Sequence, residues 1–324
     1  MSSHSARAFW ITAPAHAEIR ALDLPPPESD QVRIRTLYSG ISRGTETLVF
    51  EGRVPKSQHT CMRAPFQDGE FPAPVKYGYI NVGEVEHGPH DLLGQAVFCL
   101  YPHQDRYVVS AQDVLQLPAN LPPARAVLAA NMETAVNALW DCAPGLGDRI
   151  TVIGGGTLGC LIAWLAGRVP GVEVELLDIN RARAVTATAL GMEFAHPDQA
   201  TPERDVIFHT SATSAGLNRA LELAAFEASI VELSWYGEAS VTALLGGQFH
   251  SRRLKLISSQ VGAIAHSRRG RRNHRERMQL ALRLLCDPVL DVLITGEDRF
   301  EDLPAVMARL ADGSLDSICH RIVY

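Results

Sequence analysis

Several features that mark specialised proteins are scarce in this sequence. The six cysteines include no C-x-x-C pair, and no two stand closer than 18 residues apart, so the close thiolate pairs of a structural zinc lobe are not encoded. Aromatic residues make up only 6% of the chain, too few for a surface that stacks nucleic-acid bases. Thirty Lys and Arg face thirty-six Asp and Glu, giving a net charge of −6, and this balance argues against nucleic acid as a partner.

Signals for export or membrane insertion are also lacking. Segment 1–7 has no charged region followed by an apolar run, so no signal peptide is expected. Residues 150–167 are uncharged over 18 positions but include five glycines, which fits a strand, a glycine turn and a buried helix better than a membrane span. We therefore expect a cytoplasmic protein without membrane contact, whose cysteines are free thiols in a reducing compartment.

The chain does contain enough apolar material for folded domains. With 324 residues, 46% of them apolar, two domains are expected. The first 120 residues carry short runs punctuated by glycine and proline, which is typical of a small barrel or sandwich. Strands are expected at 6–12, 31–39, 79–87, 95–100 and 105–110.

Strands and helices alternate after the prolines at 122 and 123. Such alternation predicts a parallel sheet covered by helices on both faces. Strands are expected at 150–153, 172–177, 205–209 and 229–234, and helices at 124–140, 157–168, 181–190 and 216–225. Helices at 275–285 and 303–310 and a strand at 321–324 are expected to follow.

A G-x-G-x-x-G pattern lies between the first of these strands and its helix. Gly154 is expected to make the tight turn, Gly156 to let a pyrophosphate approach the backbone, and Gly159 to let helix and strand pack closely. Asp178 ends the next strand, nineteen residues after Gly159, where an acid accepts hydrogen bonds from an adenine-linked ribose. An empty glycine turn is the alternative.

The position of Asp178 also bears on the choice of cofactor. A carboxylate there accepts from a free 2′-hydroxyl and repels a 2′-phosphate, so NAD is favoured over NADP. Arg181 and Arg183 follow closely and are available to a phosphate. The predicted cofactor site consists of Gly154, Gly156, Thr157, Leu158, Gly159, Asp178, Arg183 and Thr210.

Over nearly its whole length the chain resembles the medium-chain dehydrogenase/reductase superfamily. The resemblance rests on residues 39–46, 78–85 and 147–153 together with the glycine turn. It implies an α/β protein in which a GroES-like β-barrel catalytic domain, 1–120 completed by 266–324, is joined to a doubly wound Rossmann domain at 121–265. It also implies an NAD(P)-dependent, alcohol dehydrogenase-like oxidoreductase that acts on a small-molecule substrate and forms a homodimer.

Two further functions stay open beside that reading. Residues 39–55 and 155–159 are also similar to bacteriochlorophyllide dehydrogenases, which suggests a dehydrogenase of a pigment or secondary-metabolite hydroxyl group. A protein of a different class, a catalytically silent dinucleotide-binding redox sensor, is compatible with the same fold because a fold does not guarantee an activity.

The departures from the zinc-dependent members of the superfamily are specific. Those members have a Cys where this chain has Ser42 or Arg43, a His where it has Tyr79, and a Cys or Glu where it has Ala130. Zinc needs three N, S or O ligands and an open position, so no catalytic zinc is expected. The remaining candidate ligands, which lack the spacing of a zinc site, are Glu46, His59, Cys61 and Glu133.

Without zinc, protein groups must polarise the substrate oxygen and move a proton. Tyr79 is the first candidate, because it stands at a lost ligand position and carries a phenol. Ser42 and Thr45 are candidate relay hydroxyls. Arg43 is a candidate to stabilise a developing alkoxide, and Glu46 to orient Arg43 or pass a proton. The alternatives are a core role for Tyr79 and a structural Arg43–Glu46 ion pair.

Other polar segments have two interpretations each. Glu133 is either a buried partner of Arg43 or a surface residue. Segment 266–277 holds six arginines and is either a solvated helix start or a site for an anionic group. Residues 209–211 and 234–237 end strands and are expected to line the cofactor crevice. The pair His320-Arg321 resembles a superfamily position near the pyrophosphate.

Overall fold

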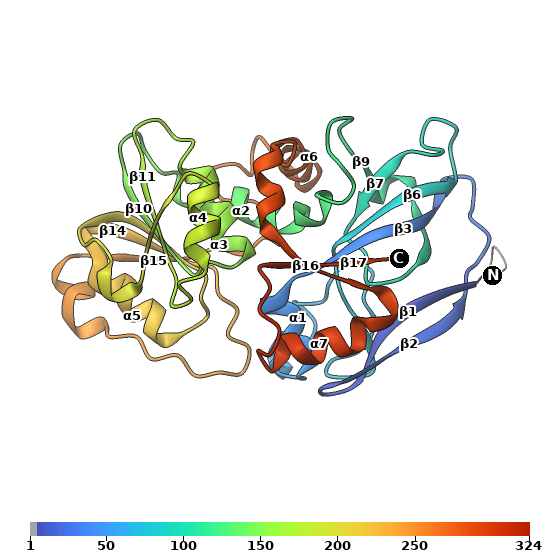
Figure 1. Cartoon of the computed structure of the whole chain (residues 1–324), viewed down its shortest axis with the longest axis horizontal. Coiled ribbons are helices and arrows are strands. Elements are labelled where there is room, and N and C mark those ends of the chain that lie inside the picture. The colour runs from blue at the N-terminus through green and yellow to red at the C-terminus, as the bar shows by residue number, and fades with distance from the viewer. Residues whose placement is uncertain (1–4) are drawn as a thin grey trace. The chain divides into compact units, whose positions relative to one another are not determined.

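The computed structural model describes residues 5–324 (Figure 1). Residues 1–4, part of the terminus where no signal peptide is expected, lie outside that range. The chain divides into two compact units, of which unit 1 is Met1–Ala130, Leu282–Cys286 and Ile294–Tyr324, and unit 2 is Asn131–Ala281 and Asp287–Leu293. The domain limits expected from the sequence, 1–120 with 266–324 and 121–265, stay a prediction.

Unit 1 is built on two sheets. One has the strand order β2-β1-β5-β4, and the other β16-β17-β3-β6-β7-β9, with β8 paired to β3. Along β3 the buried Val32 and Ile34 alternate with partly exposed arginines, because successive side chains of a strand point to opposite faces. The strands are β1 (Ser5–Ala13), β2 (His16–Asp23), β3 (Gln31–Ile41), β4 (Asp68–Gly69), β5 (Val75–Lys76), β6 (Asn81–His87), β7 (Ala96–Cys99), β8 (Arg106–Ser110), β9 (Leu115–Gln116), β16 (Ile294–Arg299) and β17 (Cys319–Val323).

Two helices, α1 (Arg43–Phe50) and α7 (Leu303–Ala311), also belong to unit 1. The sequence analysis does not predict α1, because two turns are too few to establish a helical period. Its buried side chains include Glu46, Val49 and Phe50, whose spacing of three and four residues places them on one face. A carboxylate is therefore carried into the interior on an otherwise apolar face.

Unit 2 contains a six-stranded parallel sheet with the order β12-β11-β10-β13-β14-β15 (Figure 1). The chain order reverses between β10 and β13, and such a switch point is where doubly wound sheets bind ligands at their carboxyl ends. The strands are β10 (Arg149–Ile153), β11 (Glu173–Leu177), β12 (Glu193–Ala195), β13 (Arg204–His209), β14 (Ala224–Glu232) and β15 (Lys255–Ser258). The α/β class predicted from the sequence is confirmed.

Helices α3 (Thr157–Ala166), α4 (Arg183–Ala189) and α5 (Ser214–Leu223) belong to unit 2, whereas α2 (Ala129–Cys142) and α6 (His274–Leu284) cross the limits between the units. The expectation of a helix at 216–225 is wrong at its end, because Ala224 and Ala225 already begin β14 and are buried in it. Their high helix propensity is overridden by burial in the sheet.

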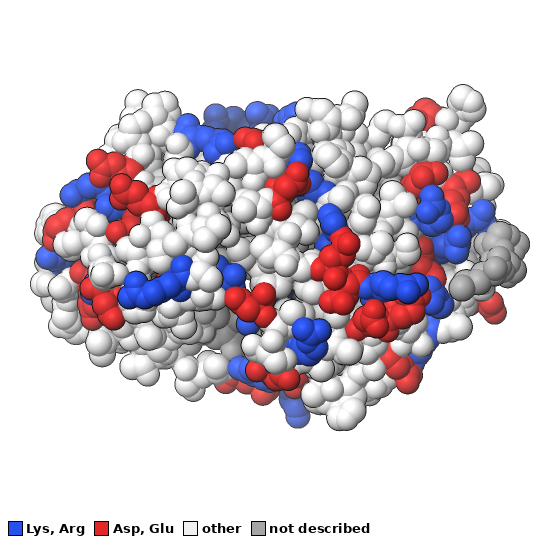
Figure 2. Space-filling model, viewed as in Figure 1, with Lys and Arg blue, Asp and Glu red and all other residues white. Residues whose placement is uncertain are grey.

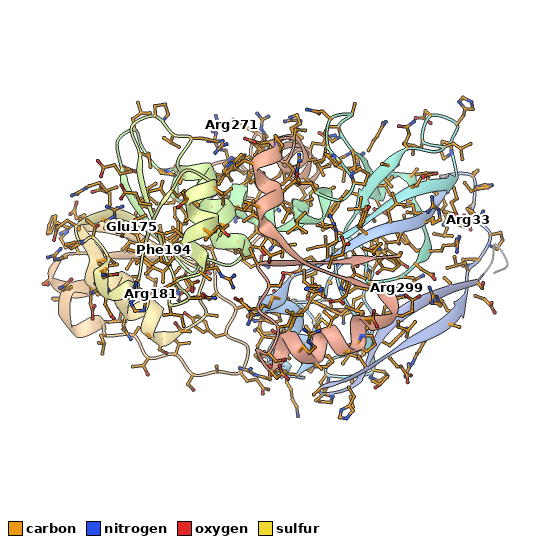
Figure 3. All side chains as sticks on the ribbon, viewed as in Figure 1. Arg33, Glu175, Arg181, Phe194, Arg271 and Arg299 are labelled. Atoms are coloured by element: carbon orange, nitrogen blue, oxygen red, sulfur yellow. The ribbon has the colours of Figure 1, made fainter. Side chains whose placement is uncertain are left out.

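Acidic and basic side chains are interspersed over the face seen in Figure 2. Basic side chains gather along its upper edge, where Figure 3 labels Arg271. Within residues 5–324, none of the helices has both the length and the apolar character that a membrane crossing requires.

Candidate functional site

The glycine turn of unit 2 has the geometry of a phosphate cradle. Gly154 has a φ of +113°, a conformation that glycine adopts without strain. A Cβ on Gly159 would lie 1.8 Å from the carbonyl oxygen of Gly154, whereas one on Gly156 would meet no atom within 4 Å. The strand and α3 thus touch at Gly159, and the space above Gly156, at the positive end of α3, is open to a phosphate.

Asp178 follows β11 and is tied to this turn. Its carboxylate accepts hydrogen bonds from the backbone N–H of Gly155 at 2.6 Å and of Asn180 at 2.7 Å. These bonds fix the carboxylate beside the phosphate cradle. A carboxylate has about four lone-pair positions, so the group retains acceptor capacity for a ribose hydroxyl.

The other predicted cofactor residues surround the same turn. Thr157 and Leu158 open α3 directly after the cradle. The hydroxyl of Thr210 donates to the carbonyl oxygens of Ile153 and Gly154, at 3.1 Å each, and so holds the turn rather than projecting from it. The stem of Arg183 packs against Gly155, since a Cβ there would lie 3.2 Å from Cγ of Arg183.

Arg181, labelled in Figure 3, hydrogen-bonds Gln199 at 3.5 Å. It therefore has a protein partner within unit 2 that the sequence analysis did not predict.

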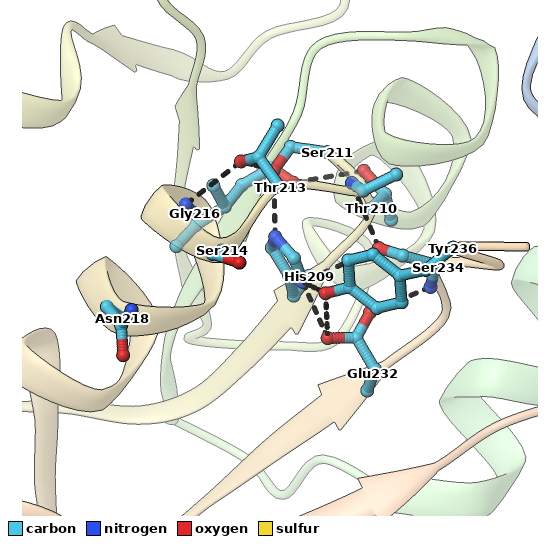
Figure 4. Close-up of polar contacts among 12 residues, drawn as sticks. His209, Thr210, Ser211, Thr213, Ser214, Gly216, Asn218, Glu232, Ser234 and Tyr236 are labelled. Carbon is cyan, nitrogen blue, oxygen red and sulfur yellow. Dashed lines mark hydrogen bonds and ion pairs between the residues drawn. The ribbon is translucent and has the colours of Figure 1, made fainter. Parts of the chain in front are cut away.

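A polar cluster lies where β13 and β14 end (Figure 4). The ring of His209 is fully buried. Its Nδ1 lies 2.7 Å from Oε2 of Glu232, and its Nε2 lies 2.7 Å from Oγ of Ser211. The phenol of Tyr236 donates to the same Glu232 oxygen at 3.0 Å, and the backbone N–H of Ser234 donates to the other at 2.8 Å. From the segments 209–211 and 234–237, which were predicted separately from strand ends, His209, Ser211, Ser234 and Tyr236 thus form one hydrogen-bonded group with Glu232.

In unit 1, three of the predicted catalytic residues, Ser42, Thr45 and Glu46, lie near the phenol of the fourth, Tyr79. Its pKa is raised to about 12, first by burial and then by the negative charge of Glu46. Side-chain hydrogen bonds with Ser42 and Thr45 act in the opposite direction and lower that pKa. The phenol therefore keeps its proton at neutral pH and is surrounded by hydroxyl groups.

Glu46 has a partner that the sequence analysis missed. Its Oε1 accepts from the backbone N–H of Ser42 at 2.7 Å, and its Oε2 lies 2.8 Å from Nε2 of His103. Nδ1 of His103 lies 2.7 Å from the hydroxyl of Ser39, which lies 3.0 Å from the phenol oxygen of Tyr324. Glu46, His103 and Ser39 are at most 3% exposed. No local signal identifies His103, because its partner stands 57 residues away in the chain.

These contacts decide between several interpretations left open by the sequence. Glu46 is bonded to His103 and to the α1 backbone, while Arg43 is exposed at the start of the helix. Glu133 is neither a partner of Arg43 nor a surface residue. It is buried, and it accepts from Nε of Arg277 at 3.1 Å within unit 2.

The basic segment 266–277 consequently has two parts. Arg277 is 1% exposed and also donates to Asn137 and to the carbonyl oxygens of Val261 and Ala263, so it holds a loop against α2. Arg271 and Arg272 are exposed (Figure 3 labels Arg271). His320 is 3% exposed in unit 1, where it lies 3.0 Å from Asp298.

Comparisons with known proteins agree with this geometry. No family model matches the chain. A curated relative, 2-dehydro-3-deoxy-L-galactonate 5-dehydrogenase from Pseudoalteromonas atlantica, is 25% identical over 169 residues, and the match spans about half of each protein, 49% of this chain and 49% of the relative.

Solved structures match over almost the whole chain. A predicted zinc-binding dehydrogenase from Sinorhizobium meliloti, bound to NADP, has a TM-score of 0.79 at 14% identity and 99% coverage of both chains. The chain has the fold of a medium-chain dehydrogenase. L-idonate 5-dehydrogenase from Escherichia coli has a TM-score of 0.79 at 15% identity, covering 99% of this chain and 98% of the other. A short chain alcohol dehydrogenase from the same species, in complex with NADH, scores 0.78 at 16% identity, covering 99% and 100%. The resemblance stated from the sequence is thus confirmed at the level of the fold.

The zinc that this fold implies does not suit the residues present. The three positions at which a ligand is expected carry a hydroxyl in Ser42, a phenol in Tyr79 and a methyl group in Ala130. The phenol of Tyr79, with its raised pKa, stays neutral where a zinc ligand must give up its proton. Of the other candidates, Glu46 is engaged by His103, and Nε2 of His59 lies 3.1 Å from the carbonyl oxygen of Val54. Within the described residues, no three His, Cys, Asp or Glu side chains are grouped as a metal site would group them.

Proposed function

We propose that the protein is an oxidoreductase that transfers a hydride between a nicotinamide cofactor and an alcohol or carbonyl substrate without catalytic zinc. The observation that carries this proposal is the neutral phenol of Tyr79, which stands among hydroxyl groups at the position of a lost zinc ligand. The shared fold with alcohol and polyol dehydrogenases supports the class of reaction. The curated sugar-acid dehydrogenase, which matches 49% of this chain, supports the same class of reaction.

NAD is the proposed cofactor. When bound, it supplies the hydride acceptor or, in its reduced form, the donor. The cradle at Gly154, Gly156 and Gly159 fits a pyrophosphate, and the fixed carboxylate of Asp178 fits a ribose with a free 2′-hydroxyl. Because solved structures of this fold contain either NADP or NADH, the preference for NAD rests on Asp178 alone.

Tyr79 is the proposed catalytic residue. In the reducing direction its phenol donates a proton to the substrate oxygen, and in the oxidising direction the phenolate takes that proton back. Ser42 and Thr45 stabilise the phenolate, since hydrogen bonds to the charged form favour it. The exposed guanidinium of Arg43 is suited to stabilise negative charge on the substrate oxygen. The charge of Glu46 favours the protonated phenol.

A turnover panel tests this function. The purified protein is mixed with NADH or NAD and a series of aldehydes, ketones, polyols and secondary alcohols, and cofactor absorbance is followed. We expect turnover with members of one structural series, and NADPH to bind more weakly than NADH. Tight binding of NADH with no turnover on any member, unaffected by Tyr79→Phe, would instead identify a redox sensor.

We further propose a cytoplasmic homodimer. The six cysteines are all free, which suits a reducing compartment. Strand β15 is the edge of the unit 2 sheet, and Phe226 and Leu256 on β14 and β15 are 63% and 43% exposed. An apolar sheet edge pairs readily with a second copy. Light scattering after gel filtration is expected to give twice the chain mass for the wild type and a single-chain mass for Leu256→Lys.

A further inference from the structure

The Glu232–His209 pair in unit 2 is a buried acid–base pair that the proposed reaction does not use. His209 has no exposed surface, and the side chain of Glu232 is 15% exposed. Besides each other, the two side chains hydrogen-bond groups that are neutral at pH 7, namely the side chains of Ser211, Ser234 and Tyr236 and the backbone N–H of Ser234 (Figure 4).

The carboxylate of Glu232 is ionised at neutral pH. Burial works to raise its pKa, but the hydrogen bonds and charge of His209, together with the bonds from Ser234, outweigh burial and lower it. Burial and the charge of Glu232 raise the pKa of Tyr236, so this phenol stays a neutral donor. The cluster therefore holds an ionised carboxylate at the carboxyl end of β14.

The Glu232–His209 pair lies in the half of the sheet that β13, β14 and β15 form. Doubly wound sheets bind one mononucleotide on each half, and the half formed by β10, β11 and β12 carries the glycine turn and Asp178. The half formed by β13, β14 and β15 then takes the second mononucleotide, which in NAD contains the nicotinamide. The two halves adjoin at the glycine turn, because a Cβ on Gly154 would lie 3.0 Å from the backbone nitrogen of Ser211.

We propose that the Glu232–His209 pair sets the relative affinity of the protein for oxidised and reduced nicotinamide. The oxidised ring carries a positive charge and the reduced ring does not, while the rest of the dinucleotide is the same. The negative charge of the Glu232 carboxylate, at the carboxyl end of β14 in the nicotinamide half, therefore favours NAD over NADH. The inference rests on the proposed function only in requiring that a nicotinamide dinucleotide binds.

Direct binding measurements test this inference without a substrate. Dissociation constants for NAD and NADH are measured by calorimetry on the wild type and on Glu232→Gln, which keeps the shape and loses the charge. We expect the ratio of the two constants to shift towards NADH on the order of tenfold, the size of one unit charge acting at close range in a partly hydrated site. A ratio unchanged within twofold would overturn the proposal.

Two further variants complete the test. His209→Asn keeps a donor for Glu232 but takes up no proton, so the preference for NAD is expected to be retained or strengthened, and its loss would contradict the proposal even if Glu232→Gln does not fold. Glu175→Gln is the matched control. Glu175 (Figure 3) is a buried carboxylate on β11, bonded to Thr201, and the adenosine half beside it is identical in both cofactors, so the ratio is expected to stay constant. If neither cofactor binds any of these proteins, the proposed function fails instead.

Discussion

In each unit a Glu–His pair lies close to a tyrosine, and the two pairs differ in their surroundings. In unit 1, Glu46 and His103 lie 2.8 Å apart, both almost fully buried. In unit 2, Glu232 and His209 lie 2.7 Å apart, and Glu232, at the carboxyl end of β14, retains some exposure. The tyrosines also differ. Tyr236 donates a hydrogen bond directly to Glu232. Tyr79 is hydrogen-bonded to hydroxyl groups, and the charge of Glu46 acts on it only by raising its pKa.

The difference suggests a division of roles. A phenol that donates to a carboxylate is committed as a structural donor, and its proton is unavailable for chemistry. A phenol that is held by hydroxyls near a carboxylate can give its proton to a ligand and still be stabilised afterwards. The contrast supports the proposals that Tyr79 transfers the proton and that the pair in unit 2 acts through its charge.

Removing the two phenols in turn should give the largest contrast. Tyr79→Phe is expected to lower turnover by about a hundred- to ten-thousandfold, the usual contribution of a general acid, while leaving the dissociation constant of NADH unchanged. Tyr236→Phe is expected to lower turnover by no more than about threefold. Steady-state kinetics on both variants check this, and equal losses would show that the division of roles is wrong.

Removing the two histidines compares the pairs through stability. His103→Ala leaves the fully buried carboxylate of Glu46 without its partner and is expected to cost about 3–5 kcal/mol. His209→Ala should cost less, about 1–3 kcal/mol, since water reaches Glu232. Urea unfolding followed by circular dichroism gives both values. A larger loss of unfolding free energy for His209→Ala than for His103→Ala would show that burial does not decide the cost of removing the histidine.

The cofactor cradle provides an internal check on unit 2. Gly159→Ala forces a methyl group against the backbone of Gly154 and is expected to cost about 1–3 kcal/mol of unfolding free energy. Gly156→Ala places its methyl group in open space, so it should leave stability within about 0.5 kcal/mol and weaken NADH binding. Thermal unfolding and calorimetry separate the two effects. Normal binding by Gly156→Ala would exclude this space as the phosphate site.

The smallest effect concerns the pKa of Tyr79. The negative charge of Glu46 raises this pKa, so Glu46→Gln should lower the pKa from about 12. The decrease is small because burial, the larger cause of the raised pKa, remains. The phenol then begins to ionise at a lower pH than in the wild type. Carbon-13 NMR of labelled tyrosine, with Tyr79→Phe to assign the signal, measures the change. An unchanged or higher pKa would show that Glu46 does not act on the phenol.

The parts of the structure that sequence predicts well are those encoded by neighbouring residues. The strand, glycine turn and helix at 150–166 follow one another in the chain, and Asp178 ends the next strand, so this half of unit 2 can be derived from spacing. The cluster around Glu46 differs, because Ser39 and Tyr324 stand 285 residues apart and meet only when β17 pairs with β3. Its key residue, His103, carries no local signal at all.

Short elements were missed for a related reason. Helix α1 has only eight residues, and strands β4, β5 and β9 have two each, so none is long enough to show a period. The pairing of Glu133 with Arg277 bridges 144 residues and was likewise beyond reach. Local patterns identified the cofactor cradle, whereas tertiary contacts determine which polar groups surround Tyr79.

The most direct test of this account is the zinc content of an active preparation. The protein is purified without added metal, its zinc is measured by mass spectrometry, and turnover is recorded before and after treatment with a chelator. The account predicts far less than one zinc per chain, turnover that survives the chelator, and loss of that turnover in Tyr79→Phe. One zinc per chain, with activity that the chelator removes and added zinc restores, would contradict it.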